Sequence, residues 1–157
     1  MNSPSDVAVD PATPGRTPLY DDGALALEAT DVMTRGVITV RDDATLDQAV
    51  DAMAANRIHA VLVVGRQTGT PLGWITTRGL LGMFGCDART PATEAITEEA
   101  KAIEPNAILR AAIYALAFPG VSRLLVRHRG ETVPLGVITD YDLTVKATRL
   151  ARRPKAP

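Results

Sequence analysis

The stretch Gly136-Val137-Ile138-Thr139-Asp140-Tyr141-Asp142 has a weaker copy earlier in the chain, Gly73-Trp74-Ile75-Thr76-Thr77-Arg78-Gly79. In both copies an apolar strand ends in a threonine, and a short helix is expected to begin just after it. Only the later copy has a carboxylate at its seventh position, where the earlier copy has a glycine. The two copies therefore share the residues that shape the junction and differ in the residue best suited to bind a ligand.

The two stretches belong to a longer internal repeat. Sliding the chain by 63 positions (136 − 73 = 63) superposes two halves without a gap, with identities that include Leu46/Leu109 and Leu62/Leu125. Hydrophobic periodicity predicts the same β-α-β-β-α order in each half. The expected elements are extended segments at 36–40 and 99–103, helices around 46–53 and 109–116, strands at 58–64 and 121–126, second strands at 72–76 and 135–139, and last helices at about 78–84 and 141–150. The sequence predicts an α/β (α+β) fold made of two pseudo-symmetric units.

The first amphipathic helix has clear signals. Apolar residues at positions 46, 49, 50 and 53 recur at i, i+3, i+4 and i+7, so all four are expected to face the core. Thr45 and Gln48 have the spacing of a capping box at the start of the helix. The apolar run from Ile58 to Val64 is continuous rather than alternating, which predicts a strand that is buried on both faces.

Composition sets the expected boundaries. Residues 1–28 hold four prolines and are expected to form a flexible N-terminal leader, although Leu19-Tyr20 and Leu25-Ala26-Leu27 are apolar enough to dock as a short strap or helix. The first unit is expected at 29–86, a linker at 87–92, the second unit at 93–149, and a basic flexible tail at 150–157. At 157 residues the chain leaves little room for an attached catalytic domain.

Charge, hydropathy and cysteine content exclude several classes of function. The net charge of −1 favours neither nucleic acid nor an anionic membrane as a partner. No apolar run approaches the ~20 residues of a membrane-spanning helix, and no secretory signal begins the chain. The single Cys86 fits a reducing, cytoplasmic location. His59 and His128 lie far from Cys86 and from each other in sequence, so we expect no metal centre and no enzymatic activity.

Each half resembles the CBS domain, the small repeat first named in cystathionine β-synthase. The motifs that carry the resemblance are Asp31-Val32-Met33-Thr34, Asp43-Ala44-Thr45-Leu46, Ile58-His59-Ala60-Val61-Leu62-Val63-Val64 and the two Gly-apolar-Ile-Thr stretches. The resemblance implies two units packed through their sheets about a pseudo-dyad, with two clefts that each use residues of both units. It also implies a homodimer and regulation of a separate, unidentified protein. The implied regulatory ligand contains adenosine, such as AMP, ADP, ATP or S-adenosylmethionine, and no resident cofactor is expected.

By similarity to the family, the first cleft uses the later copy of the opening stretch. Asp142 is expected to accept hydrogen bonds from the ribose hydroxyls, and Thr139 to contact the phosphate or the ribose edge. The other residues expected to line this cleft are Gly36, Val37, Ile38, Ile58, His59, Ala60, Val137 and Tyr141. His59 is the only basic residue placed there, which favours a mononucleotide or nucleoside-like ligand over ATP. The alternative is that Asp142 only caps the last helix and that His59 is structural.

The second cleft lacks the carboxylate because Gly79 stands in its place. The residues assigned to it are Trp74, Thr76, Arg78, Lys101, Val121, Ser122 and Arg123. Without a ribose acceptor this cleft is expected to be closed or to take an anion without a ribose. Trp74 is alternatively a core or dimer-surface residue. The corresponding alternative for the whole chain is a ligand-free structural or dimerisation module that acts through protein contacts.

Overall fold

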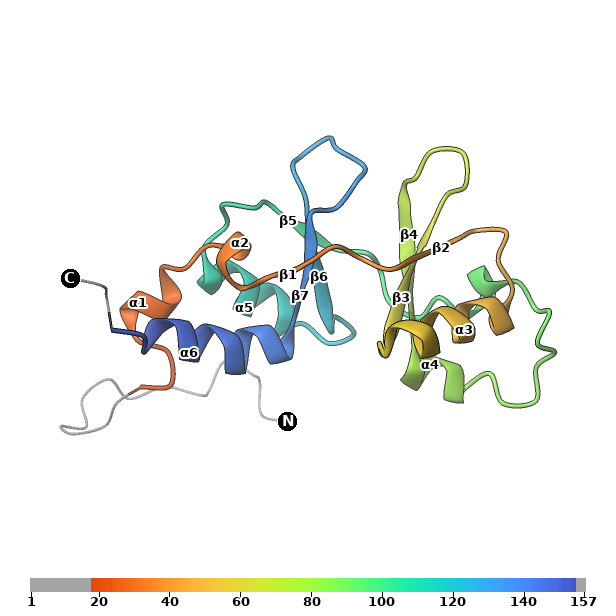
Figure 1. Cartoon of the computed structure of the whole chain (residues 1–157), viewed down its shortest axis with the longest axis horizontal. Helices are drawn as coiled ribbons and strands as arrows, with labels where there is room; N and C mark the ends of the chain where they lie inside the picture. Colours follow the sequence, from red (N-terminus) through yellow and green to blue (C-terminus); the bar gives the residue numbers. More distant parts are fainter. Residues whose placement is uncertain (1–17, 155–157) are drawn as a thin grey trace.

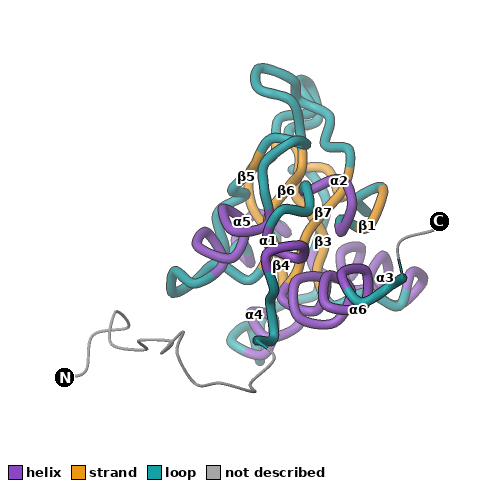
Figure 2. Tube along the Cα trace, turned by 90° about the vertical axis from the view of Figure 1, so that its left-hand side faces the viewer, coloured by secondary structure: helices purple, strands orange, loops and turns teal. Residues whose placement is uncertain are grey.

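The computed structural model describes residues 18–154, which form two small sheets that lie side by side, with helices packed against each sheet (Figures 1 and 2). One sheet has the strand order β2-β3-β4 and the other β1-β7-β6-β5. The strands are β1 (Thr34–Arg35), β2 (Thr39–Arg41), β3 (Ala60–Val64), β4 (Pro71–Thr76), β5 (Ala102–Ile103), β6 (Arg123–Val126) and β7 (Gly136–Thr139). The helices are α1 (Asp22–Leu25), α2 (Ala29–Val32), α3 (Leu46–Asn56), α4 (Thr77–Leu81), the 3₁₀ turn η2 (Ala92–Ala95), α5 (Leu109–Leu116), the π-helical segment η3 (Asp142–Lys146) and α6 (Ala147–Ala151).

Strand pairing repeats with the period of the sequence. β2 runs parallel to β3, which pairs antiparallel with β4, and β5, β6 and β7 repeat this pattern. The register also repeats, since Ala60 pairs with Thr76 and Arg123 with Thr139, each shifted by 63 (123 − 60 = 139 − 76 = 63). The predicted fold class is confirmed. The two sheets meet through a cluster of apolar side chains: Ala60, Leu62, Trp74 and Leu125, with Val37, Val64, Ala100 and Val137 packed against them.

The signals of the first amphipathic helix are mostly confirmed. The capping box between Thr45 and Gln48 is present at the start of α3. Leu46, Ala49 and Met53 are buried, but Val50, which was also expected to face the core, is 46% exposed. The apolar stripe is thus narrower than the periodicity suggests. The strand β3 is buried along most of its length, as its continuous apolar run predicts.

The leading segment of each unit crosses to the other unit. Ala29 and Val32 of α2 pack in the core of the second unit with Leu109, and β1 pairs antiparallel with β7. One repeat later (29 + 63 = 92), Ala92 and its turn η2 pack in the core of the first unit. The core of each unit therefore includes side chains from the other half of the sequence, which holds the two units together.

The ends of the described chain are more ordered than expected. In place of a flexible leader, residues 21–25 form a capped turn in which Asp21 Oδ1 accepts a hydrogen bond from the Ala24 N–H at 2.8 Å. Ala24 is fully buried and α1 lies against α5 and α6, which matches the alternative of a docked strap. Leu150, in the predicted tail, packs against the second core because α6 continues to Ala151. The remainder of the predicted leader and tail, residues 1–17 and 155–157, lies outside the described residues.

The last helices and the linker also differ in detail from the prediction. α4 ends at Leu81, which leaves Phe84 in a loop and 98% exposed. The helix expected at 141–150 is divided into η3 and α6, because hydrogen bonding is π-helical over Asp142–Lys146. Ala92, the last residue of the predicted linker, already belongs to the buried turn η2. No helix within residues 18–154 is long and apolar enough to cross a membrane.

Candidate functional site

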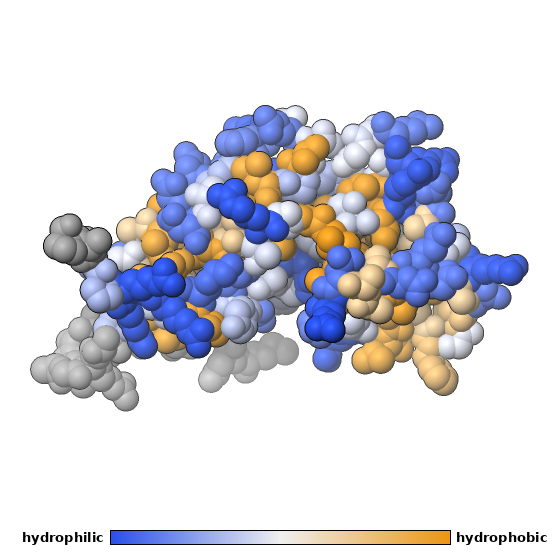
Figure 3. Space-filling model, viewed as in Figure 1, coloured by the Kyte–Doolittle hydropathy of each residue, from blue (hydrophilic) through white to orange (hydrophobic). Residues whose placement is uncertain are grey.

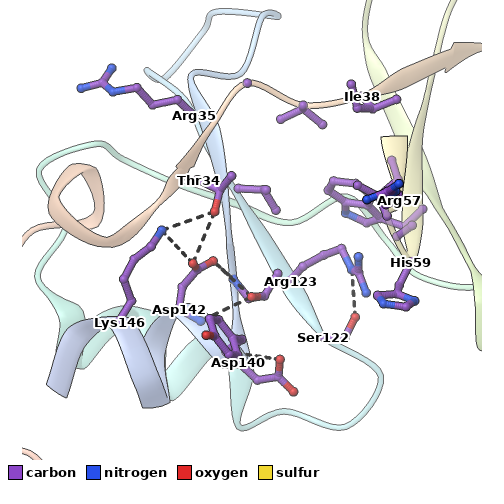
Figure 4. A pocket seen from close by; sticks show the side chains of 18 residues that line it. Thr34, Arg35, Ile38, Arg57, His59, Ser122, Arg123, Asp140, Asp142 and Lys146 are labelled. Carbon is purple, nitrogen blue, oxygen red and sulfur yellow. Dashed lines mark hydrogen bonds and ion pairs between the residues drawn. The ribbon is translucent and has the colours of Figure 1, made fainter. Parts of the chain in front are cut away.

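A cavity of about 890 Å³ lies where the two units meet, and Figure 4 shows the side chains around it. All ten residues assigned to the first cleft line it: Gly36, Val37, Ile38, Ile58, His59, Ala60, Val137, Thr139, Tyr141 and Asp142. They come from the segment between β1 and β2, from the residues around the start of β3, and from β7 with the helix that follows. The fold therefore brings together residues that lie up to 106 positions apart (142 − 36 = 106).

Asp142 is almost completely buried, at 3% exposure, yet it forms part of the cavity wall. Its Oδ2 accepts hydrogen bonds from the backbone N–H of Thr139 at 2.9 Å and from Thr139 Oγ1 at 3.1 Å, which is the geometry of a helix cap. Its Oδ1 lies 2.9 Å from Lys146 Nζ and accepts a longer hydrogen bond, 3.4 Å, from Thr34 Oγ1. The capping role is thus present, and it holds a charged acceptor at one end of the cavity.

Basic side chains are more abundant around the cavity than the sequence indicated. Besides His59, the lining includes Arg35, Arg57, Arg123 and Lys146. The prediction that His59 is the only basic residue there is wrong. Arg57 ends α3 in the left-handed conformation, with a φ of 52°, and thereby turns the chain toward the cavity. Lys146 follows Asp142 by one helical turn, a spacing that could have been recognised in the sequence.

Arg123 is the most enclosed of these cations, since its side chain is only 17% exposed. Its Nε donates a hydrogen bond to Ser122 Oγ at 3.0 Å and lies 4.0 Å from the Glu98 carboxylate. Its guanidinium carbon is 5.4 Å from the centroid of the Trp74 ring, a cation–π arrangement. Burial lowers the pKa of Arg123, although the nearby carboxylates of Glu98 and Asp140 favour its charged form.

Trp74 was assigned to the second cleft, but its side chain lies between the sheets and lines the first cavity. The pseudo-symmetry that relates it to Val137 gives the right backbone position, whereas the larger indole extends across the sheet interface. Trp74 is 2% exposed, which confirms the alternative that it is a core residue. Its Nε1 is buried and has no hydrogen-bond acceptor among residues 18–154.

A second cavity of about 400 Å³ corresponds to the second cleft. Of the residues assigned to it, Thr76, Arg78, Ser122 and Arg123 line it. The three others do not: Trp74 lies between the sheets, Lys101 lies over the Phe118 ring at 5.9 Å, and Val121 packs against the core of the second unit.

The second cavity has no space for the missing carboxylate. A Cβ atom placed on Gly79 would lie 2.7 Å from Thr97 Oγ1 and 2.9 Å from Thr97 Cγ2. Thr97 therefore occupies the space that the side chain of an aspartate would need. Thr76 Oγ1 accepts a hydrogen bond from the Gly79 N–H at 2.9 Å, so the threonine caps α4 here as Thr139 caps the helix in the first cleft.

Residues 18–154 contain no cluster of three or more histidine, cysteine, aspartate or glutamate side chains suited to hold a metal ion. The side chains around the two cavities comprise the buried carboxylate of Asp142, the carboxylates of Asp140 and Glu98, hydroxyl groups, several basic groups and apolar residues.

Comparison with known proteins agrees with this fold. The family model described as the CBS domain matches residues 29–84. A CBS domain protein from Pyrobaculum aerophilum, complexed with AMP, has a TM-score of 0.70 at 16% identity, over 79% of this chain and 96% of that one. A CBS-domain containing protein from Agrobacterium tumefaciens has a TM-score of 0.66 at 22% identity, over 77% and 98% of the two chains.

The CBS domain of a bacterial CNNM/CorC family Mg²⁺ transporter, in complex with ATP, has a TM-score of 0.68 at 16% identity, over 80% of this chain and 89% of that one. No curated protein sequence gives a match. The family model covers the first unit, and the solved structures extend the same fold over both units. The chain is therefore a CBS-domain protein.

Proposed function

We propose that the chain is a regulatory module of the cytoplasm that binds an adenine nucleotide, or a related adenosyl ligand, in the first cavity and thereby controls a separate partner protein. The proposal assigns recognition rather than catalysis to the site. The observation that carries it is the buried carboxylate of Asp142 in the wall of a cavity that also has apolar surface and several cations.

The distribution of groups along the cavity suits such a ligand. Figure 4 shows Asp142 with Thr34 and Lys146 on one side, and Arg57, His59 and Ser122 on the other. A ribose diol needs an acceptor of two hydrogen bonds, which a carboxylate supplies, while a phosphate needs cationic or N–H donors. The apolar residues Val37, Ile38 and Val137 form a wall against which an adenine ring would pack.

The solved structures support the same class of ligand. Two of the matching proteins were determined with AMP and with ATP, respectively. Their sequence identities to this chain, 16% each, limit that support to the fold. The assignment of the ligand to this chain therefore depends on the side chains around the cavity.

A thermal-shift titration with AMP, ADP, ATP and S-adenosylmethionine tests the proposal. At one hundred times the dissociation constant, a ligand that binds only the folded state stabilises it by about 2.7 kcal/mol. For a chain of this length that corresponds to a rise in Tm of roughly 5–10 °C. We expect the rise with at least one of the four ligands, and its loss in Asp142→Ala. No shift with any ligand would contradict the proposal, and a shift that persists in Asp142→Ala would contradict the site.

A second candidate function is a dimerisation module that acts through protein contacts without a small ligand. The observation in its favour is the apolar surface at the end of α4, where Leu81 is 78% and Phe84 is 98% exposed. Figure 3 shows apolar residues gathered on the lower part of the first unit, over α4. We propose that this surface pairs two copies of the chain. The two functions are compatible, and a dimer that binds none of the four ligands would favour the second.

A further inference from the structure

The two cavities share part of their walls. His59, Ser122 and Arg123 line both of them. His59 lies directly before β3, and Ser122 and Arg123 lie at the start of β6, so the shared wall is built from both units. A ligand group that contacts Arg123 from the first cavity therefore also lies next to the second cavity.

This shared wall lies away from the carboxylate. In Figure 4, Asp142 is on one side of the first cavity and His59 and Ser122 are on the other, with Arg123 extending toward them. A nucleotide whose ribose contacts Asp142 can therefore direct its phosphates toward His59 and Arg123. The phosphates beyond the first would then continue into the second cavity.

The second cavity is suited to phosphates without a sugar. It contains Arg78 in addition to the shared His59 and Arg123, and the contact between Gly79 and Thr97 leaves no space for a ribose-binding carboxylate. Glu98 is the carboxylate in its lining. The Glu98 carboxylate accepts hydrogen bonds from Ser122 Oγ at 2.7 Å and from the Ser122 N–H at 3.3 Å. Its negative charge is partly offset by Arg123, whose Nε lies 4.0 Å away.

Trp74 supplies an independent observation at the same place. Its ring lies beside the Arg123 guanidinium, and its buried Nε1 has no acceptor among residues 18–154. A buried N–H donor without a partner costs free energy, which an incoming acceptor recovers.

From these observations we propose that the second cavity holds the outer phosphates of a nucleotide whose adenosine lies in the first, which makes the ligand a nucleoside diphosphate or triphosphate rather than a monophosphate. This inference rests on the proposed function. It replaces the preference for a mononucleotide, which depended on His59 being the only basic residue at the site.

The test compares adenosine, AMP, ADP and ATP as ligands in EDTA, with binding followed by the fluorescence of Trp74, the only tryptophan in the chain. We expect the dissociation constant to fall by about ten-fold or more from AMP to ADP or ATP, the effect of one additional charge-assisted hydrogen bond. Arg78 is exposed and lines only the second cavity, so Arg78→Ala should bring the AMP-to-ATP ratio of dissociation constants close to one.

Arg110→Ala is the matched control, because it also removes one exposed arginine but lies on α5, outside both cavities. This variant should keep the wild-type ratio, whereas Asp142→Ala should weaken AMP and ATP alike. Equal affinities for AMP and ATP, or a ratio that survives Arg78→Ala, would overturn the inference and leave the proposed function intact. If none of these ligands binds, the inference is overturned, and the proposed function is overturned with it when S-adenosylmethionine also fails to bind.

Discussion

The Asp142 carboxylate lies 2.9 Å from Lys146 Nζ, and the same ammonium group donates hydrogen bonds to the backbone oxygens of Val32, at 2.8 Å, and Met33, at 3.3 Å. Val32 and Met33 belong to the segment that crosses from the first half of the sequence into the core of the second unit. Lys146 therefore joins the carboxylate of the cavity to the segment that holds the two units together.

We expect Lys146→Met to lower the free energy of unfolding by about 1–3 kcal/mol, because the substitution leaves a buried carboxylate without its cation. The expected loss is smaller than for a fully buried ion pair, because the lysine side chain is 37% exposed and solvent screens its charge. Urea denaturation gives the measurement. The control is Arg149→Met, which changes an exposed cation on α6 and should alter stability by less than about 0.5 kcal/mol. Equal stability of Lys146→Met and the wild type would contradict this role for the ion pair.

Gly136, the first residue of the opening stretch, allows β1 to approach β7. A Cβ atom at this position would lie 2.4 Å from the backbone oxygen of Thr34 and 2.8 Å from Met33 Sδ. Because a backbone oxygen cannot move away without breaking the strand pairing, we expect Gly136→Ala to destabilise the fold by about 1–3 kcal/mol in urea denaturation. Gly23→Ala meets nothing closer than 3.4 Å and should be neutral or slightly stabilising.

The periodicity and the repeat predict the fold class, the element order and the hairpins, because each of these depends on the local pattern of apolar residues. The crossing of α2 and η2 could not be predicted in this way, since it brings together residues far apart in the chain. Ala29 packs in one core with Leu109 (109 − 29 = 80), and Ala92 packs in the other with Leu46 (92 − 46 = 46). The docking of α1 depends on the same long-range core. A continuous apolar pattern shows that a segment is buried but does not show which unit buries it.

For the candidate site, the resemblance to the CBS domain supplied ten residues that the structure places around one cavity. That they bind a ligand stays a prediction. Arg57 and Lys146 were missed, and Arg123 was assigned only to the second cleft. Arg57 depends on a left-handed helix end and Arg123 on a wall shared by two cavities, whereas the i, i+4 spacing of Lys146 from Asp142 was present in the sequence. Trp74 was misplaced because pseudo-symmetry describes the backbone, whereas the reach of a side chain depends on its size.

The proposed pairing of two copies predicts that Phe84→Glu gives a monomer. A charge at a fully exposed apolar position should not disturb the monomer fold, but it would be buried at an apolar interface, where it is costly. Light scattering after size exclusion gives the molar mass of the wild type and the variant at the same concentration. Val133→Glu serves as the control, because Val133 is 74% exposed in the loop between β6 and β7. A wild type that is monomeric at every concentration would exclude this pairing.

The role proposed for Asp142 can be separated from its structural role by changing the ligand as well as the protein. If the carboxylate accepts a hydrogen bond from the ribose, 2′-deoxy-AMP should bind the wild type about ten-fold more weakly than AMP, the loss of one charge-assisted hydrogen bond. In Asp142→Asn, which retains an oxygen that can accept the hydrogen bond from the Thr139 N–H, both ligands should bind weakly and with similar affinity. Isothermal titration calorimetry well below the Tm of the variant gives the four dissociation constants. If 2′-deoxy-AMP binds more weakly than AMP by the same factor in the wild type and in Asp142→Asn, the ribose contact lies elsewhere. Asp142 then acts only as the cap of its helix.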